Sequence, residues 1–456
     1  MSWRWESGLT RGECSTDISR NMAMDRRTIS ALILLLCTLI SGQASGARVY
    51  IDIESPELRP LPIAVARFEA MGKSEPEVAS RIMKTLTNDL TISGFFEIIP
   101  QSEFPPEREA MANPPDFDRW VGSRAEALVT GDYSVEGNRL AIEFRLFDLV
   151  EKAFLSGKRY QGETKSLRDM IHRIANEITY WITGERGVFD TRIAFVSTIS
   201  GNKEIYAIDF DGHQLTQLTK NGSINLSPAW SPTGRVIAFT SYIKRNPDLY
   251  LLDLARSVQV RLSTNPGLNA AAAWSPDGTM MALMMRREGN AEIFIISRDG
   301  TRPRRLTKSW SSEASPTWSP DGKKIAFVSD RAGSPQIYTM DVNGRNPKRL
   351  TFLGSYNASP CWSPKGDKIT YCGRMDGHFD IFTINPDGTG IRRLTEVSGN
   401  NESPTWSPDG RFIAFSSTRE GRSRIYVMNA NGANQRRLTS TRGKESSPTW
   451  SPRMDR

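Results

Sequence analysis

Residues 315–322 read Ser-Pro-Thr-Trp-Ser-Pro-Asp-Gly, and this stretch decides the fold because close copies of it recur along the chain. Its Trp-Ser-Pro core appears six times, and successive copies are 44 residues apart: Trp230, Trp274, Trp318, Trp362, Trp406 and Trp450. A fixed period of 40 to 45 residues is typical of β-propellers, in which each repeat forms a blade of four strands.

Each repeat predicts four short strands separated by turns. Around Trp318 these strands cover residues 315–318, 324–329, 336–341 and 348–351, and Pro320 and Gly322 supply the backbone angles of the first turn. The first repeat begins at Thr191 with no Trp-Ser-Pro strand before it, whereas the last Trp-Ser-Pro lies at the C-terminus. We therefore predict that the C-terminal strand completes the first blade and closes a six-bladed ring over residues 190–456.

The residues before the repeats divide into two parts. Residues 1–47 combine the charged Asp25-Arg26-Arg27, the apolar run Ala31–Ile40 and small residues up to Ala47, which predicts a signal peptide cleaved after Ala44 or Ala47. Residues 48–186 lack the period and alternate strand-like and helix-like patterns. The predicted fold is a signal peptide, then a small mixed α/β domain, then an all-β six-bladed propeller.

The basic charge of the chain falls largely on the propeller edge. There are 59 Lys+Arg against 51 Asp+Glu, a net charge of +8. Basic pairs recur on the predicted fourth strands, at Arg304-Arg305, Lys348-Arg349, Arg392-Arg393 and Arg436-Arg437. We interpret them as protection of exposed strand edges and not as a nucleic-acid surface, because these strands lack the aromatic residues that stack on bases.

Residues suited to catalysis or metal binding are scarce. The chain has three His and four Cys, and it contains no Gly-x-Ser-x-Gly, no His-Glu-x-x-His and no Walker-type loop. We therefore expect no catalytic residues, no metal and no cofactor. Cys361 and Cys372 lie on either side of one predicted hairpin turn, which favours a disulfide in an exported protein, the alternative being two buried thiols.

The first strand of each blade lines the central channel of a propeller, so its leading residues are candidates for binding. Five positions before each tryptophan the residue is polar: Asn225, Asn269, Glu313, Asn357, Asn401 and Glu445. Mostly small residues follow, including Leu226, Ser227, Ala270, Ala314, Ser315, Ala358 and Glu402. Such a ring suits docking of a peptide or protein loop, although the polar residues alternatively cap strand ends in water.

A second set of polar residues opens the third strands. Its members are Glu204, Asp248, Glu292, Gln336, Asp380 and Arg424. Because third strands lie away from the axis, we expect these residues at the surface, paired with nearby arginines rather than with a metal ion.

The signal peptide, the α/β domain beginning Arg48-Val49-Tyr50-Ile51-Asp52-Ile53-Glu54, and the six blades together resemble the TolB family of the Tol–Pal system. The resemblance covers essentially the whole mature chain. The blade motif alone is less specific, since similar repeats cap some serine peptidases. The second full blade departs from the pattern, because Asn269-Ala270-Ala271-Ala272-Ala273 replaces the usual Ser-Pro.

The resemblance implies a periplasmic binding protein that is not an enzyme, is monomeric alone and does not insert into the membrane. It implies that the lipoprotein Pal binds the channel mouth, and that the C-terminal domain of TolA pairs with the mature N-terminus: Arg48, Val49, Tyr50, Ile51, Asp52, Ile53, Glu54 and Ser55. The implied roles are outer-membrane integrity, envelope constriction in cell division, and exploitation by imported colicins. The alternative is an exported peptidase-like or ligand-binding propeller.

Overall fold

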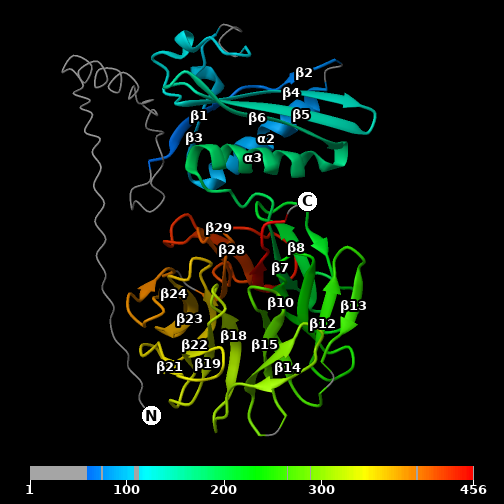
Figure 1. The fold of residues 1–456 in the computed structure, drawn as a ribbon, viewed down its shortest axis with the longest axis vertical. Coiled ribbons are helices and arrows are strands. Elements are labelled where there is room, and N and C mark those ends of the chain that lie inside the picture. Colours follow the sequence, from blue (N-terminus) through cyan, green and yellow to red (C-terminus); the bar gives the residue numbers. More distant parts are fainter. Residues whose placement is uncertain are drawn as a thin grey trace, which may run out of the picture. The chain divides into compact units, whose positions relative to one another are not determined.

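The computed structural model describes residues 59–72, 75–106, 112–263, 265–287, 289–396 and 399–454 (Figure 1). The predicted signal peptide and the segment Arg48–Ser55 lie outside these residues. The described part comprises a mixed α/β region followed by six four-stranded sheets, which confirms the predicted fold class.

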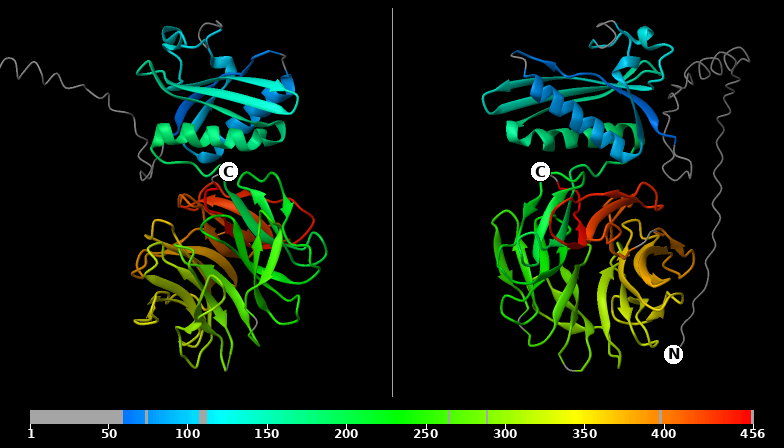
Figure 2. Two further views of the ribbon diagram at one scale, coloured as in Figure 1. Left: turned by 45° about the vertical axis from the view of Figure 1, so that its right-hand side comes forward. Right: turned by 180° about the vertical axis from the view of Figure 1, so that it is seen from behind.

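The α/β domain is built on one sheet with the strand order β3-β1-β4-β5-β6, and β2 pairs with β4. Strand β1 runs parallel to β3 and β4, whereas β4, β5 and β6 form an antiparallel meander. The two helices pack on one face of the sheet (Figure 2). The strands are β1 (Leu61–Val65), β2 (Glu69–Ala70), β3 (Phe96–Ile99), β4 (Ala127–Glu136), β5 (Arg139–Asp148) and β6 (Ala153–Glu163), and the helices are α2 (Pro76–Ser93) and α3 (Leu167–Thr183).

Both helices follow the spacing of their apolar residues. In α2, Ile82, Leu86 and Leu90 lie on one face and are fully buried. The helix starts with Pro76, whose missing N–H costs nothing in a first turn, and ends at Gly94, which adopts φ of 72°. In α3 the buried face includes Ile171, Ile174 and Ile178. The helices therefore bury a shared apolar layer against the sheet.

The propeller blades follow one another without insertions. Blade 1 contains β30 (Glu445–Trp450), β7 (Arg192–Ser197), β8 (Glu204–Asp209) and β9 (Thr216–Gln217); blade 2, β10 (Asn225–Trp230), β11 (Val236–Ser241), β12 (Asp248–Asp253) and β13 (Val258–Arg261); blade 3, β14 (Asn269–Trp274), β15 (Met280–Met285), β16 (Glu292–Ser297) and β17 (Arg304–Arg305); blade 4, β18 (Glu313–Trp318), β19 (Lys324–Ser329), β20 (Gln336–Asp341) and β21 (Lys348–Arg349); blade 5, β22 (Asn357–Trp362), β23 (Ile369–Met375), β24 (His378–Ile384) and β25 (Arg392–Arg393); and blade 6, β26 (Asn401–Trp406), β27 (Phe412–Ser417), β28 (Arg424–Asn429) and β29 (Arg436–Arg437).

The C-terminal strand closes the ring, as predicted. Strand β30 pairs antiparallel with β7, with Trp450 opposite Ile193 and Glu445 opposite Ser197. The first blade therefore combines strands separated by almost the whole propeller sequence.

The repeated tryptophans connect neighbouring blades. The indole Nε1 of Trp318 donates a hydrogen bond to the carbonyl of Ala273 at 3.1 Å, and that of Trp406 donates to the carbonyl of Cys361 at 3.2 Å. Each acceptor lies on the first strand of the preceding blade. Tryptophan is thus required at this position both as a large apolar side chain and as a donor. Trp362 differs, because its Nε1 has no hydrogen-bond partner among the described residues.

This difference supplies a matched pair of substitutions. Both Trp406→Phe and Trp362→Phe replace an indole by a smaller phenyl ring. Only Trp406→Phe also removes a hydrogen bond to a carbonyl. We expect Trp406→Phe to lower the free energy of unfolding by about 1 kcal/mol more than Trp362→Phe does. Denaturant unfolding of both variants measures this, and equal losses would mean that the indole bond contributes nothing.

The basic pairs of the fourth strands are bound to other parts of the ring. Arg305 contacts Glu292 at 2.6 Å and Arg393 contacts Asp380 at 2.5 Å. The first members of two pairs reach the next blade: Arg304 donates to the carbonyl of Val342 at 3.2 Å, and Arg436 to that of Phe210 at 2.9 Å. These cations therefore stabilise contacts within and between blades, in addition to charging the edge.

Candidate protein-binding site around the propeller axis

The six first strands surround the propeller axis. Each contacts the first strand of the next blade, and β30 contacts both β26 and β10, so that the circle is complete. The leading residues of these strands therefore lie around a common axis.

Every first strand contains a bulge at the same position. Pairing with the second strand shifts register there in all six blades, and the residue three before tryptophan adopts a positive φ of 49° to 54°. These residues are Ser227, Ala271, Ser315, Ser359, Ser403 and Ser447. The left-handed conformation costs a non-glycine residue about 1–2 kcal/mol. Bulges re-aim side chains and occur next to functional sites, which marks this part of the strand.

The polar residues five before each tryptophan are buried, none being more than 2% exposed. They join adjacent blades: the amide of Asn225 donates to Glu204 at 2.9 Å, and that of Asn401 donates to Asp380 at 3.0 Å. Glu313 instead contacts Arg331 at 2.8 Å. Neither full exposure at a channel mouth nor simple capping in water describes them, because they are buried and contact other groups of the same or the neighbouring blade.

Five of the six residues of the second polar set are buried as well, and Arg424 is partly buried, so the expectation of a surface location was wrong for these five. The side chains of Asp248 and Asp380 are 0% exposed, and that of Glu292 is 3% exposed. Pairing with arginine is confirmed for these three, for example between Asp248 and Arg261 at 2.6 Å. Two acids of this set, Glu204 and Asp380, also accept hydrogen bonds from Asn225 and Asn401, the leading residues of the next blades.

The accessible surface begins one residue after the buried set. We define the inner ring as the two residues that follow it in each blade, of which all except Ala270 are partly exposed: Leu226, Ser227, Ala270, Ala271, Ala314, Ser315, Ala358, Ser359, Glu402, Ser403, Ser446 and Ser447. Its members are small or hydroxylic except for Leu226 and Glu402. The inner ring therefore offers a shallow surface with one acidic group.

Glu402 stands out within the inner ring. Its carboxylate has no hydrogen bond or ion pair with any described residue, and partial burial raises its pKa above the ordinary value. A carboxylate held partly out of water without a partner is destabilising for the free protein. It is therefore a candidate for pairing with a donor on a binding partner.

The sequence analysis missed exposed apolar residues in the loops that lead into the first strands. Trp310 is 99% exposed, and Phe352 and Leu353 are 68% and 60% exposed. These loops lead directly into the first strands that carry the inner ring. A comparison of the repeats could have found them, because these residues depart from their equivalents in the other blades. None of the other five blades has tryptophan at the position of Trp310, and their residues at the positions of Phe352 and Leu353 are mostly polar. Clusters of this kind mark interaction sites.

The predicted disulfide is not formed: Cys361 and Cys372 are free thiols. Cys361 pairs with Thr370 and Cys372 with Ala358, so the two cysteines are offset by two positions and are not directly opposite. Burial raises the pKa of the Cys372 thiol to about 11, which makes its reactive thiolate form rare. The alternative of two thiols holds, with Cys372 buried and Cys361 partly buried.

No helix in the described part of the chain is long and apolar enough to cross a membrane. The fold defines a class of two-domain proteins in which an α/β domain precedes a six-bladed propeller. Profiles described as "TolB beta propeller domain" and "TolB amino-terminal domain" match residues 180–454 and 49–155. The chain belongs to the TolB family of the Tol–Pal system.

Individual relatives agree with this assignment. "Tol-Pal system protein TolB" of Desulfosudis oleivorans is 43% identical over 217 residues, covering 46% of this chain and 49% of the relative. The protein of the same name from Geobacter sulfurreducens is 44% identical over 205 residues, covering 45% and 48%. These matches span about half the length of the curated relatives. The crystal structure of TolB from Acinetobacter baumannii is similar with a TM-score of 0.76 and 26% identity, covering 86% of this chain and 97% of that one.

Proposed function

We propose that the chain is the periplasmic protein-binding component of the Tol–Pal envelope complex, that it binds Pal through the inner ring and TolA through its mature N-terminus, and that it is not an enzyme. The observation that carries the Pal site is the accessible inner ring with the partnerless Glu402 carboxylate, together with the exposed Trp310, Phe352 and Leu353 in the loops that lead into the first strands. Family membership supports the partners.

Two groups of residues have different roles at the proposed Pal site, one in direct contact and one in positioning. The inner ring makes the direct contacts, together with the apolar loop residues. The buried set of Asn225, Asn269, Glu313, Asn357, Asn401 and Glu445 holds the strand ends in place through contacts within and between blades. Exposed aromatic and apolar side chains combined with polar groups are the usual composition of a protein interface.

The N-terminal segment Arg48–Ser55 pairs with TolA by adding a strand to a sheet of its C-terminal domain. Such pairing depends on main-chain hydrogen bonds, with alternate side chains giving specificity. By linking TolA and Pal, the chain maintains outer-membrane integrity and supports envelope constriction during division, and imported colicins exploit the same surfaces.

Substitution of Glu402 tests the Pal site through two opposite effects. Burial raises the pKa of Glu402 in the folded chain above its value in the unfolded chain. The free energy of unfolding therefore falls as the pH rises from the unfolded-state pKa through the folded-state pKa. At pH 7.5 the carboxylate is ionised and destabilises the folded chain. We expect Glu402→Gln to raise Tm of the free chain by about 1–2 °C at pH 7.5 and not at pH 4, since solvent screening keeps the penalty small. We also expect it to weaken Pal binding by about tenfold, because a charge-assisted bond is lost.

Glu151→Gln is the matched control, since Glu151 is an exposed acid in the α/β domain. It should leave both Tm and Pal affinity unchanged. Trp310→Ala is the second variant, and we expect it to reduce affinity by about tenfold or more without changing Tm, because Trp310 is exposed in the free chain. Calorimetric titrations with Pal in which Glu402→Gln and Trp310→Ala both bind like the unmodified chain would exclude this surface.

A further inference from the structure

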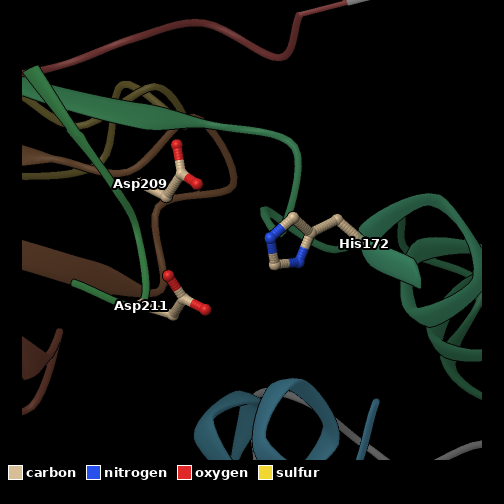
Figure 3. A group of neighbouring side chains, drawn as sticks. All are labelled: His172, Asp209 and Asp211. Carbon is tan, nitrogen blue, oxygen red and sulfur yellow. The ribbon is translucent and has the colours of Figure 1, made fainter. Parts of the chain in front are cut away.

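A cluster of three side chains, separate from the inner ring, lies where α3 meets blade 1. His172 projects from α3, and Asp209 and Asp211 come from the end of β8 and the turn after it (Figure 3). One nitrogen of the imidazole and one oxygen of each carboxylate all lie within 4.8 Å of one another. Two different parts of the fold therefore bring three potential metal ligands together.

The imidazole of His172 is fixed in one orientation. Its Nδ1 lies 2.7 Å from Oδ2 of Asp89, a carboxylate of α2 that is itself 0% exposed. The ring of Phe210 packs edge-on against the imidazole, with ring centres 5.7 Å apart. With Nδ1 directed at Asp89, the opposite nitrogen Nε2 faces the side of Asp209 and Asp211 (Figure 3).

Nε2 of His172 is the unexplained atom of the cluster. The residue is 2% exposed, and no described residue hydrogen-bonds to Nε2. A buried polar atom without a partner costs about 1–3 kcal/mol, so such atoms usually have a ligand, an ion or a water. A small cavity of about 20 Å³ adjoins the imidazole and is also lined by Asp209. That volume accommodates one ion or one water and excludes an organic ligand.

Each of the two carboxylates forms an ion pair with an arginine. Arg168 forms an ion pair with Asp211, and Nε of Arg192 lies 3.2 Å from Oδ1 of Asp209. A neighbouring guanidinium favours the ionised form of a carboxylate, and coordination requires that form. A carboxylate offers about four lone pairs, so it can accept from a guanidinium and bind a cation at the same time.

We propose that His172, Asp209 and Asp211 form a binding site for a divalent transition-metal ion, with Zn²⁺ as its occupant and a water as fourth ligand. One imidazole with two carboxylates suits Zn²⁺ and does not suit Mg²⁺ or Ca²⁺, which prefer oxygen ligands alone. The contact from Asp89 to Nδ1 is the arrangement that orients zinc-binding histidines and increases their basicity.

Binding would tighten the contact between α3 and blade 1. Ligand atoms about 2.1 Å from a shared tetrahedral centre stand about 3.4 Å apart, so the cluster contracts from its present spacing of up to 4.8 Å. The ion would thereby join the α/β domain to the propeller that carries the inner ring. This role is independent of which protein binds the inner ring.

Zinc titration of the untagged mature chain, residues 48–456, freed of metal by a chelator, tests the proposal. At pH 7.5 we expect one Zn²⁺ per chain by calorimetry, a rise in Tm of about 5 °C at saturation, and no heat with Ca²⁺. Zinc X-ray absorption should show one imidazole and oxygen ligands at about 2.0–2.1 Å. These measurements use the unmodified chain, so they do not depend on whether a variant folds.

Two substitutions locate the ion, and two others serve as controls. His172→Gln and Asp209→Asn should lower zinc affinity by at least 100-fold, and His378→Gln, a change in a histidine beside Asp380 in blade 5, should leave it unchanged. His213→Gln should also retain binding, because His213 contacts Asp211 from an exposed position. The proposal is overturned if the unmodified chain binds no Zn²⁺ at millimolar concentration, if His213→Gln and not His172→Gln abolishes binding, or if Ca²⁺ binds in its place.

Discussion

A chain truncated after Lys444 is expected to lose the whole propeller fold, not only one strand. The deletion removes β30, which pairs with β7 and completes blade 1. Among the described strands, only β30 covers this edge of β7. It also removes Trp450, which donates to Oγ1 of Thr191 at 2.8 Å and stacks on Phe412 with ring centres 6.3 Å apart. Both edges of the opened ring then expose unpaired backbone groups and apolar surface. Since total stability of a folded domain is about 5–15 kcal/mol, this loss exceeds what the ring can tolerate.

Circular dichroism and limited proteolysis of the purified truncated chain measure this outcome. Truncation after Met454 is the matched control, because it leaves β30 and the contact of Arg453 with the carbonyl of Gly187 in place. The control should give a native β-sheet spectrum and a cooperative transition. A chain ending at Lys444 that unfolds cooperatively at the same temperature as the control would show that closure by β30 is dispensable.

The architecture was predictable because its signals are local and repeated. Trp-Ser-Pro at a period of 44 residues defines the start of each blade, and the Pro-Asp-Gly turn defines the first hairpin. In blade 4 that turn is closed by the side chain of Ser319, which accepts from the backbone N–H of Lys324 at 2.9 Å. Closure of the ring was also predictable. The first repeat lacks its first strand, and the C-terminus carries one extra first strand that can pair with it.

The buried location of the polar residues was not predictable, because it depends on partners in another blade. Asn401 has the same identity whether it caps a strand in water or donates to Asp380 across a blade boundary. Only the packing of blade 6 on blade 5 decides between these environments. The leading polar residues are therefore buried, and the accessible surface is displaced by one place in each strand, to residues such as Ala314 and Glu402 that were also predicted.

The bulge at Ser227 and its equivalents explains part of that displacement. An alternating strand would direct every second residue to the axis, but the extra residue shifts the pairing from Leu226 to Ala229. A residue before proline usually avoids the α regions, so the positive φ of Ser227 runs against its local preference. Packing within the ring imposes this conformation, and the sequence of a single blade does not predict it. The same shift places Cys361 and Cys372 in offset positions.

Deleting Arg48–Ser55 is expected to abolish binding to the C-terminal domain of TolA, with a loss of at least 100-fold, and to leave Pal affinity within twofold. The reason is that the two proposed sites use separate residues: a terminal strand for TolA and the inner ring for Pal. Calorimetric titrations of the deleted chain with each partner separately measure both values. Equal losses for both partners would contradict the division of the two sites.

The chemistry of the TolA contact can be resolved within the same segment. If an added strand pairs through its main chain, Ile51→Pro removes a donor from the ladder and should weaken TolA binding by about tenfold more than Ile51→Ala, which shortens the side chain alone. Similar losses from both substitutions would instead indicate recognition of the isoleucine side chain in a pocket. Because Ile51 lies far in sequence from the inner ring residues, neither substitution should change Pal binding, so a change in Pal affinity would mean that the segment acts on the propeller itself.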